Sequence, residues 1–415
     1  MSTGAGSNGV RNIVVVGGGI IGCSTAYYLT RHPAFLPSRA TVTLVEASAH
    51  GAAQGASGKA GGLVAKWAYP KELVEVSFNE HVKLAGEHNG AERWGWRYVS
   101  PGSWEGRGER LPDDSAATGN AKRERSLEKT RGLEDAQTGP GSAERRRKGL
   151  PDDLQWVKEH LTESYSPMAL AGATAQVHPY LFTISLLELA KEKGAEFKSG
   201  KVTAILKSDG KVAGVEYTPS GHANPQTLPA TDVIVCAGAW SPSLLPGLPI
   251  EGMRAHSVVI RPPPTMAIAP YVLFTEIAGL SAASVMTPEI YARPDGTVYA
   301  CGPGDDSPLP ETVDGVEVTS TACETLLRNV TSISDELRQG TVETRQACFL
   351  PVSTVGGGPV VGEATKIARG LFIAAGHTCW GISNAPGTAK AMAELVLEGQ
   401  VRCADLKKLH PSKFF

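Results

Sequence analysis

The chain has 415 residues, of which 41% are hydrophobic and 20% charged. This is an ordinary globular composition, so global disorder is excluded, and the length favours two domains over one. The formal net charge of −2 gives no argument for binding nucleic acid, which requires a basic surface.

The first predicted elements form a β-α-β unit. Residues 1–10 are small and polar, without the basic and apolar regions of a signal peptide. Residues 12–16, NIVVV, are typical of a buried parallel strand, and residues 41–46, TVTLVE, of a second one. Between them, residues 20–31 are predicted to be a helix.

The turn between the first strand and this helix matches a dinucleotide-binding fingerprint. Gly17, Gly19 and Gly22 allow a tight turn, backbone approach to a pyrophosphate, and close packing of helix on strand. The helix N-terminus offers free N–H groups to phosphates. Glu46 ends the second strand, 24 residues after Gly22, where a ribose-binding acid is expected. No arginine follows it to receive the 2′-phosphate of NADP, but the fingerprint alone leaves FAD and NAD open.

The following elements are predicted in chain order. A small-residue loop covers 51–63, in which Ser57 and Lys59 are candidates to reach phosphate oxygens. Residues 71–88 are expected to be a helix, 94–99 a strand, 180–193 a helix, 200–217 a hairpin turning at Asp209-Gly210, 231–239 a buried strand, 254–304 strand-rich, 316–339 helical, 357–375 two strands and 384–398 a helix.

Residues 101–150 differ in composition, with many charged residues, serines and glycines and almost no aliphatic ones. Such a segment buries too little apolar surface to offset its ordering entropy, so we expect a mobile insertion. Its basic cluster at 145–148 is either a recognition patch or part of a solvated loop.

Three glycine-ended strands, at 12–19, 233–238 and 372–376, suit a long cofactor lying extended across one domain, which favours FAD over NAD. The predicted FAD-binding domain is discontinuous, with residues 11–100, 176–245 and 345–400. Residues 151–175 and 246–344 form the expected substrate domain.

Several motifs resemble the FAD-dependent superfamily that contains D-amino-acid oxidase, glycine oxidase and sarcosine oxidase, nearest to a fungal branch of uncharacterised oxidoreductases. They are VVVGGGIIG (14–22), LVEA (44–47), GASGKAGGLVAKWAY (55–69), HPYLFTISLLELA (178–190), VIVCAGAW (233–240), RPDGTVYACG (293–302) and GLFIAAGHTCWGISNAPG (370–387). The resemblance implies an α/β (α+β overall) fold, with a Rossmann-like FAD-binding domain interleaved with a mostly antiparallel β-sheet that covers the flavin.

The resemblance also implies cofactor contacts. Besides the three fingerprint glycines, Glu46, Ser57 and Lys59, they are Ile20, Ile21, Ala47, Gly61, Gly62, Leu63, Val202, Ala237, Gly238, Trp240, Cys348, Gly376, His377, Trp380, Gly381 and Ile382. The helix after this last turn would stabilise negative charge on reduced flavin. A cysteine near Cys348 is joined to flavin in sarcosine oxidase, so Cys348 is either such a link or a buried apolar thiol.

The resemblance further gives candidates for the chemistry. A substrate carboxylate needs a cation, and Lys66 and Arg293 are the candidates. Trp380 and His377 are expected beside the flavin, where His377 either assists proton transfer or packs through a hydrogen bond. A catalytic lysine of sarcosine oxidase is replaced here by Ser383.

These features predict an FAD-dependent oxidase that acts on the C–N bond of an amine or amino acid, with O2 as acceptor. The alternative is a flavin-binding protein whose main role is to bind a partner, for which the 101–150 segment is the argument. No metal site, nucleic acid or membrane span is expected. The seven scattered cysteines, without a CxxC pair, favour reduced thiols and a cytoplasmic location.

Overall fold

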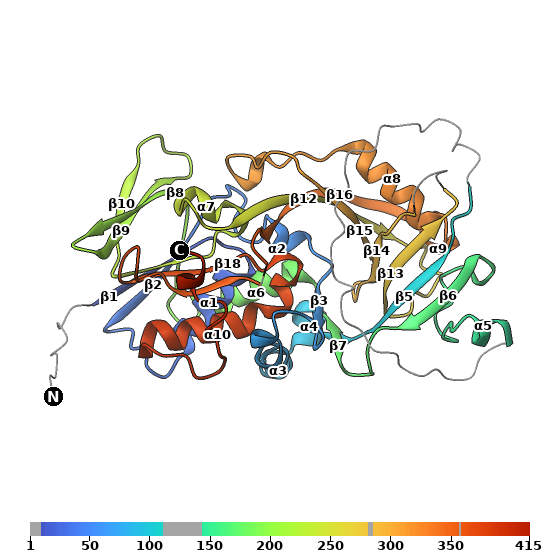
Figure 1. Cartoon of the computed structure of the whole chain (residues 1–415), viewed down its shortest axis with the longest axis horizontal. Helices are drawn as coiled ribbons and strands as arrows, with labels where there is room; N and C mark the ends of the chain where they lie inside the picture. The colour runs from blue at the N-terminus through green and yellow to red at the C-terminus, as the bar shows by residue number, and fades with distance from the viewer. Residues whose placement is uncertain (1–9, 111–142, 281–284, 357) are drawn as a thin grey trace.

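Two large β-sheets, one toward each end of the long axis, organise the chain (Figure 1). The computed structural model describes residues 10–110, 143–280, 285–356 and 358–415. The first described strand, which begins at Arg11, belongs to the sheet that contains the predicted fingerprint, and the C-terminus lies beside this sheet (Figure 1). The α/β fold with an antiparallel second sheet is therefore as the sequence predicted.

The N-terminal β-α-β unit forms within a residue or two of its predicted limits. It consists of β1 (Arg11–Val16), α1 (Ile20–Arg31) and β2 (Ala40–Glu46), with β1 and β2 parallel. Five parallel strands form the centre of the first sheet, because β1 also pairs with β11, β2 with β8, and β11 with β18. The full order is β10 (Gln226–Pro229), β9 (Lys211–Pro219), β8 (Glu196–Ser208), β2, β1, β11 (Asp232–Val235), β18 (Leu371–Ala375) and β17 (Val360–Glu363).

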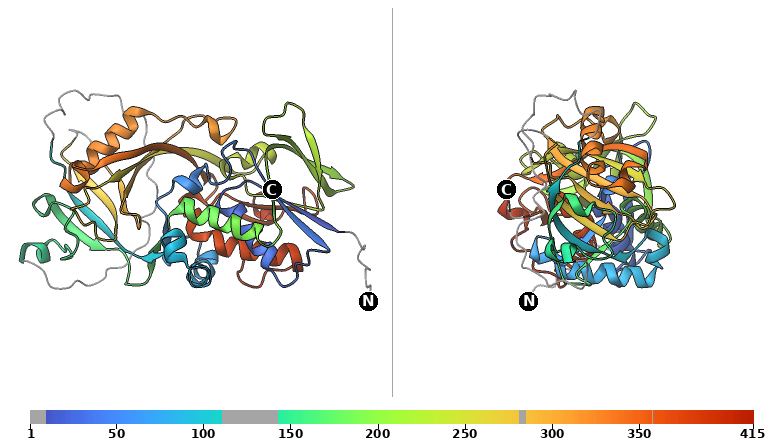
Figure 2. Two further views of the ribbon diagram at one scale, coloured as in Figure 1. Left: turned by 180° about the vertical axis from the view of Figure 1, so that it is seen from behind. Right: turned by 90° about the vertical axis from the view of Figure 1, so that its right-hand side faces the viewer.

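Four helices pack together against the first sheet, as the view from behind shows (Figure 2). α1 contacts both α6 (Pro179–Lys191) and α10 (Gly381–Glu398), and α10 also contacts α3 (Lys71–Glu87). The central strands are fully buried, which explains why they are continuous apolar runs. The predicted hairpin is confirmed: Asp209 and Gly210 have φ angles of 50° and 71°, as a two-residue type I′ turn requires.

The second sheet has seven strands and is antiparallel except where β13 pairs with β5. One of its faces is covered by α8 (Ser320–Thr331), and the other packs toward the first domain. A short helix, α9 (Asp335–Arg338), follows α8. The strand order is β16 (Thr341–Ser353), β12 (Ile250–Arg261), β15 (Val298–Asp305), β14 (Glu289–Ala292), β13 (Tyr271–Ala278), β5 (Ser100–Arg107) and β6 (Thr162–Pro167).

A three-stranded sheet lies between the two large ones (Figure 1). It has the order β3 (Leu63–Ala65), β7 (Thr174–Gln176) and β4 (Arg97–Tyr98). The predicted strand at 94–99 is thus wrong in its limits: Trp94 ends a short helix, α4 (Gly90–Trp94), and only Arg97–Tyr98 pair as a strand.

The expected insertion at 101–150 is also wrong in its limits. Residues 100–107 are an interior strand, β5, held between β13 and β6, and residues 143–147 form a helix, α5 (Ala143–Arg147). The rest of that segment, 111–142, lies outside the described residues. Likewise β16 belongs to the second sheet, although its residues 345–353 were assigned to the FAD-binding domain.

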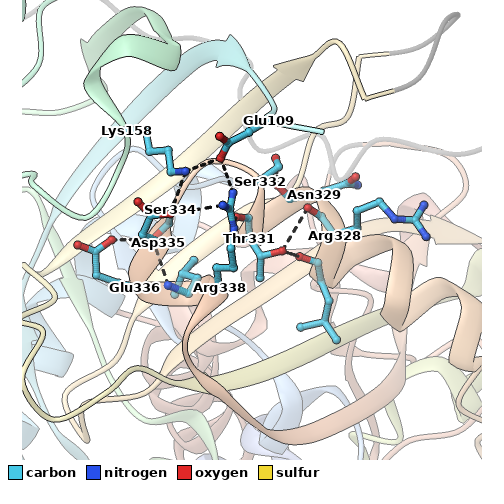
Figure 3. Close-up of polar contacts among 12 residues, drawn as sticks. Glu109, Lys158, Arg328, Asn329, Thr331, Ser332, Ser334, Asp335, Glu336 and Arg338 are labelled. Carbon is cyan, nitrogen blue, oxygen red and sulfur yellow. Dashed lines mark hydrogen bonds and ion pairs between the residues drawn. The ribbon is translucent and has the colours of Figure 1, made fainter. Parts of the chain in front are cut away.

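An ion-pair network holds the end of β5 against α9 (Figure 3). The Glu109 carboxylate lies 2.5 Å from Lys158 Nζ and 2.6 Å from an Arg338 nitrogen, and Lys158 also lies 2.8 Å from Asp335. The hydrogen bonds from Lys158 and Arg338 lower the pKa of Glu109 to about 2. The chain on both sides of residues 111–142 is therefore anchored to the second sheet.

Candidate cofactor and substrate site

The glycine fingerprint lies where β1 ends against β11. Gly17 has a φ of 110°, and a side chain there would meet the Cys236 carbonyl oxygen at 2.5 Å. A Cβ on Gly22 would lie 1.9 Å from the Gly17 carbonyl oxygen, so α1 packs on this turn only if residue 22 is glycine. Gly19 is the N-cap of α1 and provides no capping side chain, and the first turn of α1 contains no acid. The helix start is thus built to receive an anion.

Glu46 lies at the end of β2 beside this turn. Its carboxylate accepts hydrogen bonds from the backbone N–H groups of Gly18 (2.6 Å) and Ser48 (2.7 Å). Burial raises the pKa of Glu46, and these backbone donors oppose that rise. Each oxygen keeps a lone pair, so the group is fixed in place and still able to accept from ribose hydroxyls.

Ser57 and Lys59 lie on one short helix, α2 (Ala56–Lys59), but they face different spaces. The Ser57 hydroxyl accepts from the Ile20 N–H at 2.8 Å and lines the same cleft as the glycine turn. Lys59 instead donates to the Ala347 carbonyl at 3.1 Å and lines a neighbouring cavity with Arg293 and His178. The structure therefore brings Ser57, and not Lys59, to the phosphate-binding turn.

One elongated cleft joins most of the predicted cofactor residues. It encloses about 1310 Å³, part of it open to solvent. The predicted residues that line it are Gly17, Gly19, Ile20, Ile21, Glu46, Ala47, Ser57, Val202, Ala237, Gly238, Trp240, Gly376, His377, Gly381 and Ile382. The cleft thus runs from the ribose-binding acid to the start of α10.

Other predicted residues lie behind the cleft wall. A Cβ on Gly61 would meet the Tyr291 ring at 2.7 Å, and one on Gly62 would meet the Val177 carbonyl oxygen at 1.9 Å. Leu63 and Trp380 pack in the hydrophobic cluster between the two domains. Sequence reasoning missed several lining residues from distant loops: Ala53, Gln54, Lys201, Ser243, Glu311, Thr312, Val313, Phe349 and Leu350.

The start of α10 is stabilised from α3. Pro386 lies inside the helix and has no N–H to donate to the Ile382 carbonyl, four residues earlier. His81 lies 3.0 Å from that oxygen and 3.2 Å from the Ser383 carbonyl oxygen, through Nε2. Burial lowers the pKa of His81 to about 4, so the ring is neutral and donates from Nε2. The first turn of α10 is held rigidly at the cleft.

His377 and Trp380 flank this helix start. His377 contacts the Thr388 hydroxyl at 3.0 Å through Nε2, and burial lowers its pKa to about 3. A neutral, hydrogen-bonded packing role therefore fits His377 better than proton transfer near neutral pH. The Trp380 indole N–H is buried and has no acceptor among the described residues.

A family comparison decides which cofactor the cleft serves. Residues 12–395 match the model of the family described as FAD dependent oxidoreductase (DAO). The chain belongs to this FAD-dependent oxidoreductase family.

Two fungal relatives of this DAO-family protein cover almost the whole chain. One is TDA3 of Saccharomyces cerevisiae, named an oxidoreductase, which is 34% identical over 99% of this chain and 96% of its own length. The other, C1F5.03c of Schizosaccharomyces pombe, also named an oxidoreductase, is 32% identical over 97% of this chain and 98% of its own.

Solved structures show the same fold at low identity. Iminodiacetate oxidase from Chelativorans sp. BNC1 superimposes with a TM-score of 0.68 at 20% identity, covering 96% of this chain and 98% of that one. Glycine oxidase from Bacillus cereus gives 0.65 at 19% identity, with coverages of 94% and 96%. The family match makes FAD the cofactor of this DAO-family chain, and the open turn at Gly19 and the Glu46 carboxylate fit it.

The two predicted carboxylate-binding cations of this flavoprotein, Lys66 and Arg293, are absent from the lining of the cleft. Lys66 is exposed, and its Nζ lies 4.8 Å from the centre of the Phe78 ring on α3. Arg293 is buried; it donates to the Ala60 carbonyl at 2.8 Å and lies over the Tyr299 ring. Burial lowers the pKa of Arg293, and its Nε has no partner among the described residues. Arg293 thus anchors the loop that leads into the FAD cleft.

Cys348 is buried on β16 and is absent from the cleft lining, although its neighbours Phe349 and Leu350 line it. Burial raises the pKa of its thiol to about 11, against a smaller opposing effect of Lys59. A reactive cysteine needs thiolate character, so this setting favours the buried apolar thiol over a flavin link. The described residues contain no cluster of potential metal ligands. Within that same part of the chain, no helix combines the length and apolarity needed to cross a membrane.

Proposed function

We propose that this protein oxidises the C–N bond of an amine or amino acid, with transfer of a hydride to the flavin and O2 as the final acceptor. The observation that carries the proposal is the course of the cleft. It begins at the dinucleotide turn and ends at α10, next to the aromatic face of the second sheet. A substrate between that face and the cofactor would be shielded from water.

When bound, FAD supplies the electron pair acceptor, and the protein's contribution is to orient and to shield. The first turn of α10 has no side-chain cap and no acid, so its N–H groups favour negative charge at this end of the cleft. The loop at Ala60 is held by Arg293, and buried tryptophan and tyrosine side chains exclude water from the other side.

The partner-binding alternative rested on the basic cluster at 145–148, and its side chains are largely engaged within the protein. Arg145 pairs with Glu159 at 3.1 Å and donates to two backbone carbonyls. Lys148 contacts Glu144 at 3.1 Å and donates to the Glu159 carbonyl. Two of the four cations are thus largely buried in local contacts, which argues against a recognition patch.

The test is anaerobic reduction of the holoprotein. Amines, N-methyl amino acids and D- and L-amino acids are added without oxygen, and loss of the oxidised flavin absorbance is followed. We expect at least one class to bleach the flavin, and admitting oxygen to restore the colour and release peroxide. If admitting oxygen does not restore the colour of the bleached flavin, the oxidase assignment is wrong and the electron acceptor is another compound. No bleaching by any of these compounds would contradict the proposal.

A further inference from the structure

A long connection of the second sheet reaches the FAD-binding domain. Residues 306–319, which we call the strap, join β15 to α8. In Figure 1 this segment, in orange, runs from the second sheet above β12 toward α7 (Ser241–Leu244). Its ends stay on the second sheet, where Arg254 of β12 pairs with Asp305 at 3.1 Å and donates to the Thr319 hydroxyl at 3.2 Å. The strap is therefore anchored at both ends in one domain, and its middle contacts the other.

Two contacts hold the strap at the rim of the cofactor cleft. The Trp240 indole N–H donates to the Pro310 carbonyl at 2.7 Å. Lys201 Nζ on β8 lies 2.5 Å from a carboxylate oxygen of Glu311. Both Trp240 and Lys201 line the cleft, so these contacts place the strap directly beside the space that FAD would occupy.

A third contact connects the strap to the acid expected to bind ribose. The Asp314 carboxylate accepts from the Ser48 hydroxyl at 2.5 Å and from the Ala49 backbone N–H at 2.9 Å. The Ser48 backbone N–H in turn donates to Glu46 at 2.7 Å. Burial is the main cause that raises the pKa of Glu46, and the negative charge of Asp314 adds to it. Asp314 thus lies near Glu46 and shares Ser48 with it.

The strap is itself part of the cleft wall. Glu311, Thr312 and Val313 line the same cleft as Glu46 and Val202. In dinucleotide sites the acid that ends the second strand binds the adenosine ribose. The strap therefore borders the adenosine end of the cleft, and the start of α10 borders the flavin end.

The strap is docked by few and accessible contacts. Every residue from 306 to 319 is exposed or half-buried. The side chains of the Lys201–Glu311 pair are 36% and 84% exposed, and ion pairs of this kind contribute little stability. Segments with few buried apolar contacts open at a low free-energy cost, without unfolding of the sheets around them. The middle of the strap can therefore leave the first domain while its ends stay on β12.

We propose that the strap forms part of the FAD site, that it closes over the adenosine end of the bound cofactor, and that FAD enters and leaves only when it opens. The inference goes beyond the proposed oxidase function, because it depends on the family's cofactor and not on the substrate. Both domains then contribute to FAD binding. Docking of the strap and binding of FAD stabilise each other, since each coupling of this kind is reciprocal.

The first experiment joins the strap covalently to the FAD-binding domain. A Cβ on Gly55 would lie 3.6 Å from Val313 Cγ2, so cysteines at both positions are near enough for a disulfide, whose Cβ atoms lie about 3.5–4.5 Å apart. Holoprotein carrying Gly55→Cys and Val313→Cys is loaded with radiolabelled FAD and oxidised, and a thiol count confirms the bond. Exchange with unlabelled FAD is then timed before and after addition of dithiothreitol.

We expect the disulfide to slow FAD exchange about tenfold or more, and dithiothreitol to restore the rate, because release requires an opening that the bond prevents. Apoprotein oxidised before FAD is added should bind FAD more slowly by a similar factor. Each single cysteine variant controls for the substitution and should not respond to dithiothreitol. Equal exchange rates with the disulfide formed and reduced would overturn the inference.

A substitution tests the opening without any new bond. Asp314→Ala removes the acceptor of the Ser48 hydroxyl and the Ala49 N–H, so the strap should open more often. We expect both FAD association and FAD release to become about fivefold faster. Glu317→Ala removes the same charge from an exposed position on the strap and should leave both rates unchanged. Faster release with unchanged association would show a lost binding contact in place of an opening, and would contradict the inference.

These measurements contain no substrate, so they are independent of the proposed oxidation. An unchanged Tm of the apoprotein variants distinguishes a change in the strap from a damaged fold. Wild-type rates of FAD association and release in Asp314→Ala would overturn the role of the strap and leave the oxidase proposal intact. Failure of every amine and amino acid to reduce the flavin would contradict the oxidase and leave the strap as proposed.

Discussion

Replacing His81 by phenylalanine would remove one hydrogen-bond donor to the first turn of α10 and keep the packing of the ring. The ring stacks on Trp96 with an interplanar angle of 11° and also contacts Phe182, and phenylalanine would keep both contacts. What it removes is the N–H group between His81 and the carbonyls of Ile382 and Ser383. The first of these carbonyls lacks its helical donor because residue 386 is proline.

The size of the effect follows from two opposing contributions. Leaving a buried carbonyl without a donor costs about 1–3 kcal/mol. The substitution also removes His81 Nδ1, which is buried without a partner among the described residues, and this returns about 1 kcal/mol. We therefore expect His81→Phe to lower the free energy of unfolding at pH 7 by up to about 2 kcal/mol.

The pH dependence has a definite sign. Since burial lowers the pKa of His81 to about 4, the native state disfavours the proton that the unfolded chain accepts below its ordinary pKa. The stability that neutral His81 contributes is fully present above pH 6.5 and is lost as the pH falls toward 4. About 2 kcal/mol of the unfolding free energy is lost in this way between pH 7 and pH 5. Phenylalanine does not titrate, so the difference in unfolding free energy between wild type and His81→Phe should shrink to near zero by pH 5.

The assay is urea unfolding of holoprotein at a fixed excess of FAD, at pH 7 and pH 5, with Pro386→Ala as the second arm of a double-mutant cycle. Alanine restores the N–H that Ile382 lacks, so His81→Phe should cost less in that background, with a coupling of about 1 kcal/mol. Equal costs in both backgrounds, or a deficit at pH 5 as large as at pH 7, would refute this account of the helix start.

Four further outcomes are expected. Gly22→Ala forces a Cβ to 1.9 Å from the Gly17 oxygen and should yield protein without flavin absorbance, whereas Gly86→Ala, in open space on α3, should keep it. Acid precipitation should leave the flavin in the supernatant, because Cys348 lies outside the cleft lining; a yellow pellet would show a covalent link. Arg293→Lys should weaken FAD binding about tenfold by loosening its bond to Ala60, which titration of the apoprotein with FAD would measure. His377→Asn should reduce the loss of stability between pH 7 and pH 5 by about 2 kcal/mol, since buried His377 resists protonation until about pH 3; an unchanged pH dependence would contradict this.

Local sequence patterns predicted the elements whose structure is determined by their own residues. The apolar run 12–16, the glycine turn and the Asp209-Gly210 hairpin each form as predicted, because burial of a short strand and a positive φ are properties of the residues themselves. α10 also ends at its predicted glycine, Gly399, but begins at Gly381, three residues before the expected start.

Pairing between distant segments was not predictable in the same way. The strand Ser100–Arg107 reads SPGSWEGR, a polar and glycine-rich sequence with little strand character of its own. It becomes a strand because β13 and β6 pair with it on both sides and bury Trp104. Phe349 and Leu350 reach the cleft for a similar reason, since only the sheet order brings β16 beside the turn before α10.

Arg293 shows that a residue can be singled out from sequence although its contacts cannot. The resemblance of the motif RPDGTVYACG (293–302) predicts a functional role for Arg293. No local pattern indicates that its guanidinium donates to the Ala60 carbonyl, because the two residues lie 233 positions apart in the chain. Side-chain direction at the end of a strand depends on the loop it meets, and that loop belongs to the other domain.

The two sides of the cleft therefore differ in what specifies them. The cofactor side is built mainly from backbone: glycines that permit close approach, the free N–H groups of α1 and α10, and a carboxylate fixed by two amides. The substrate side is built from side chains at alternate positions of separate strands, each replaceable without disturbing strand pairing. A change to a side chain on the substrate side should therefore alter which molecule is oxidised while FAD stays bound, whereas a change at Gly22 should abolish both. Family membership depends on the residues of the cofactor side and therefore identifies the cofactor. The substrate has to be inferred from the side chains of the substrate side.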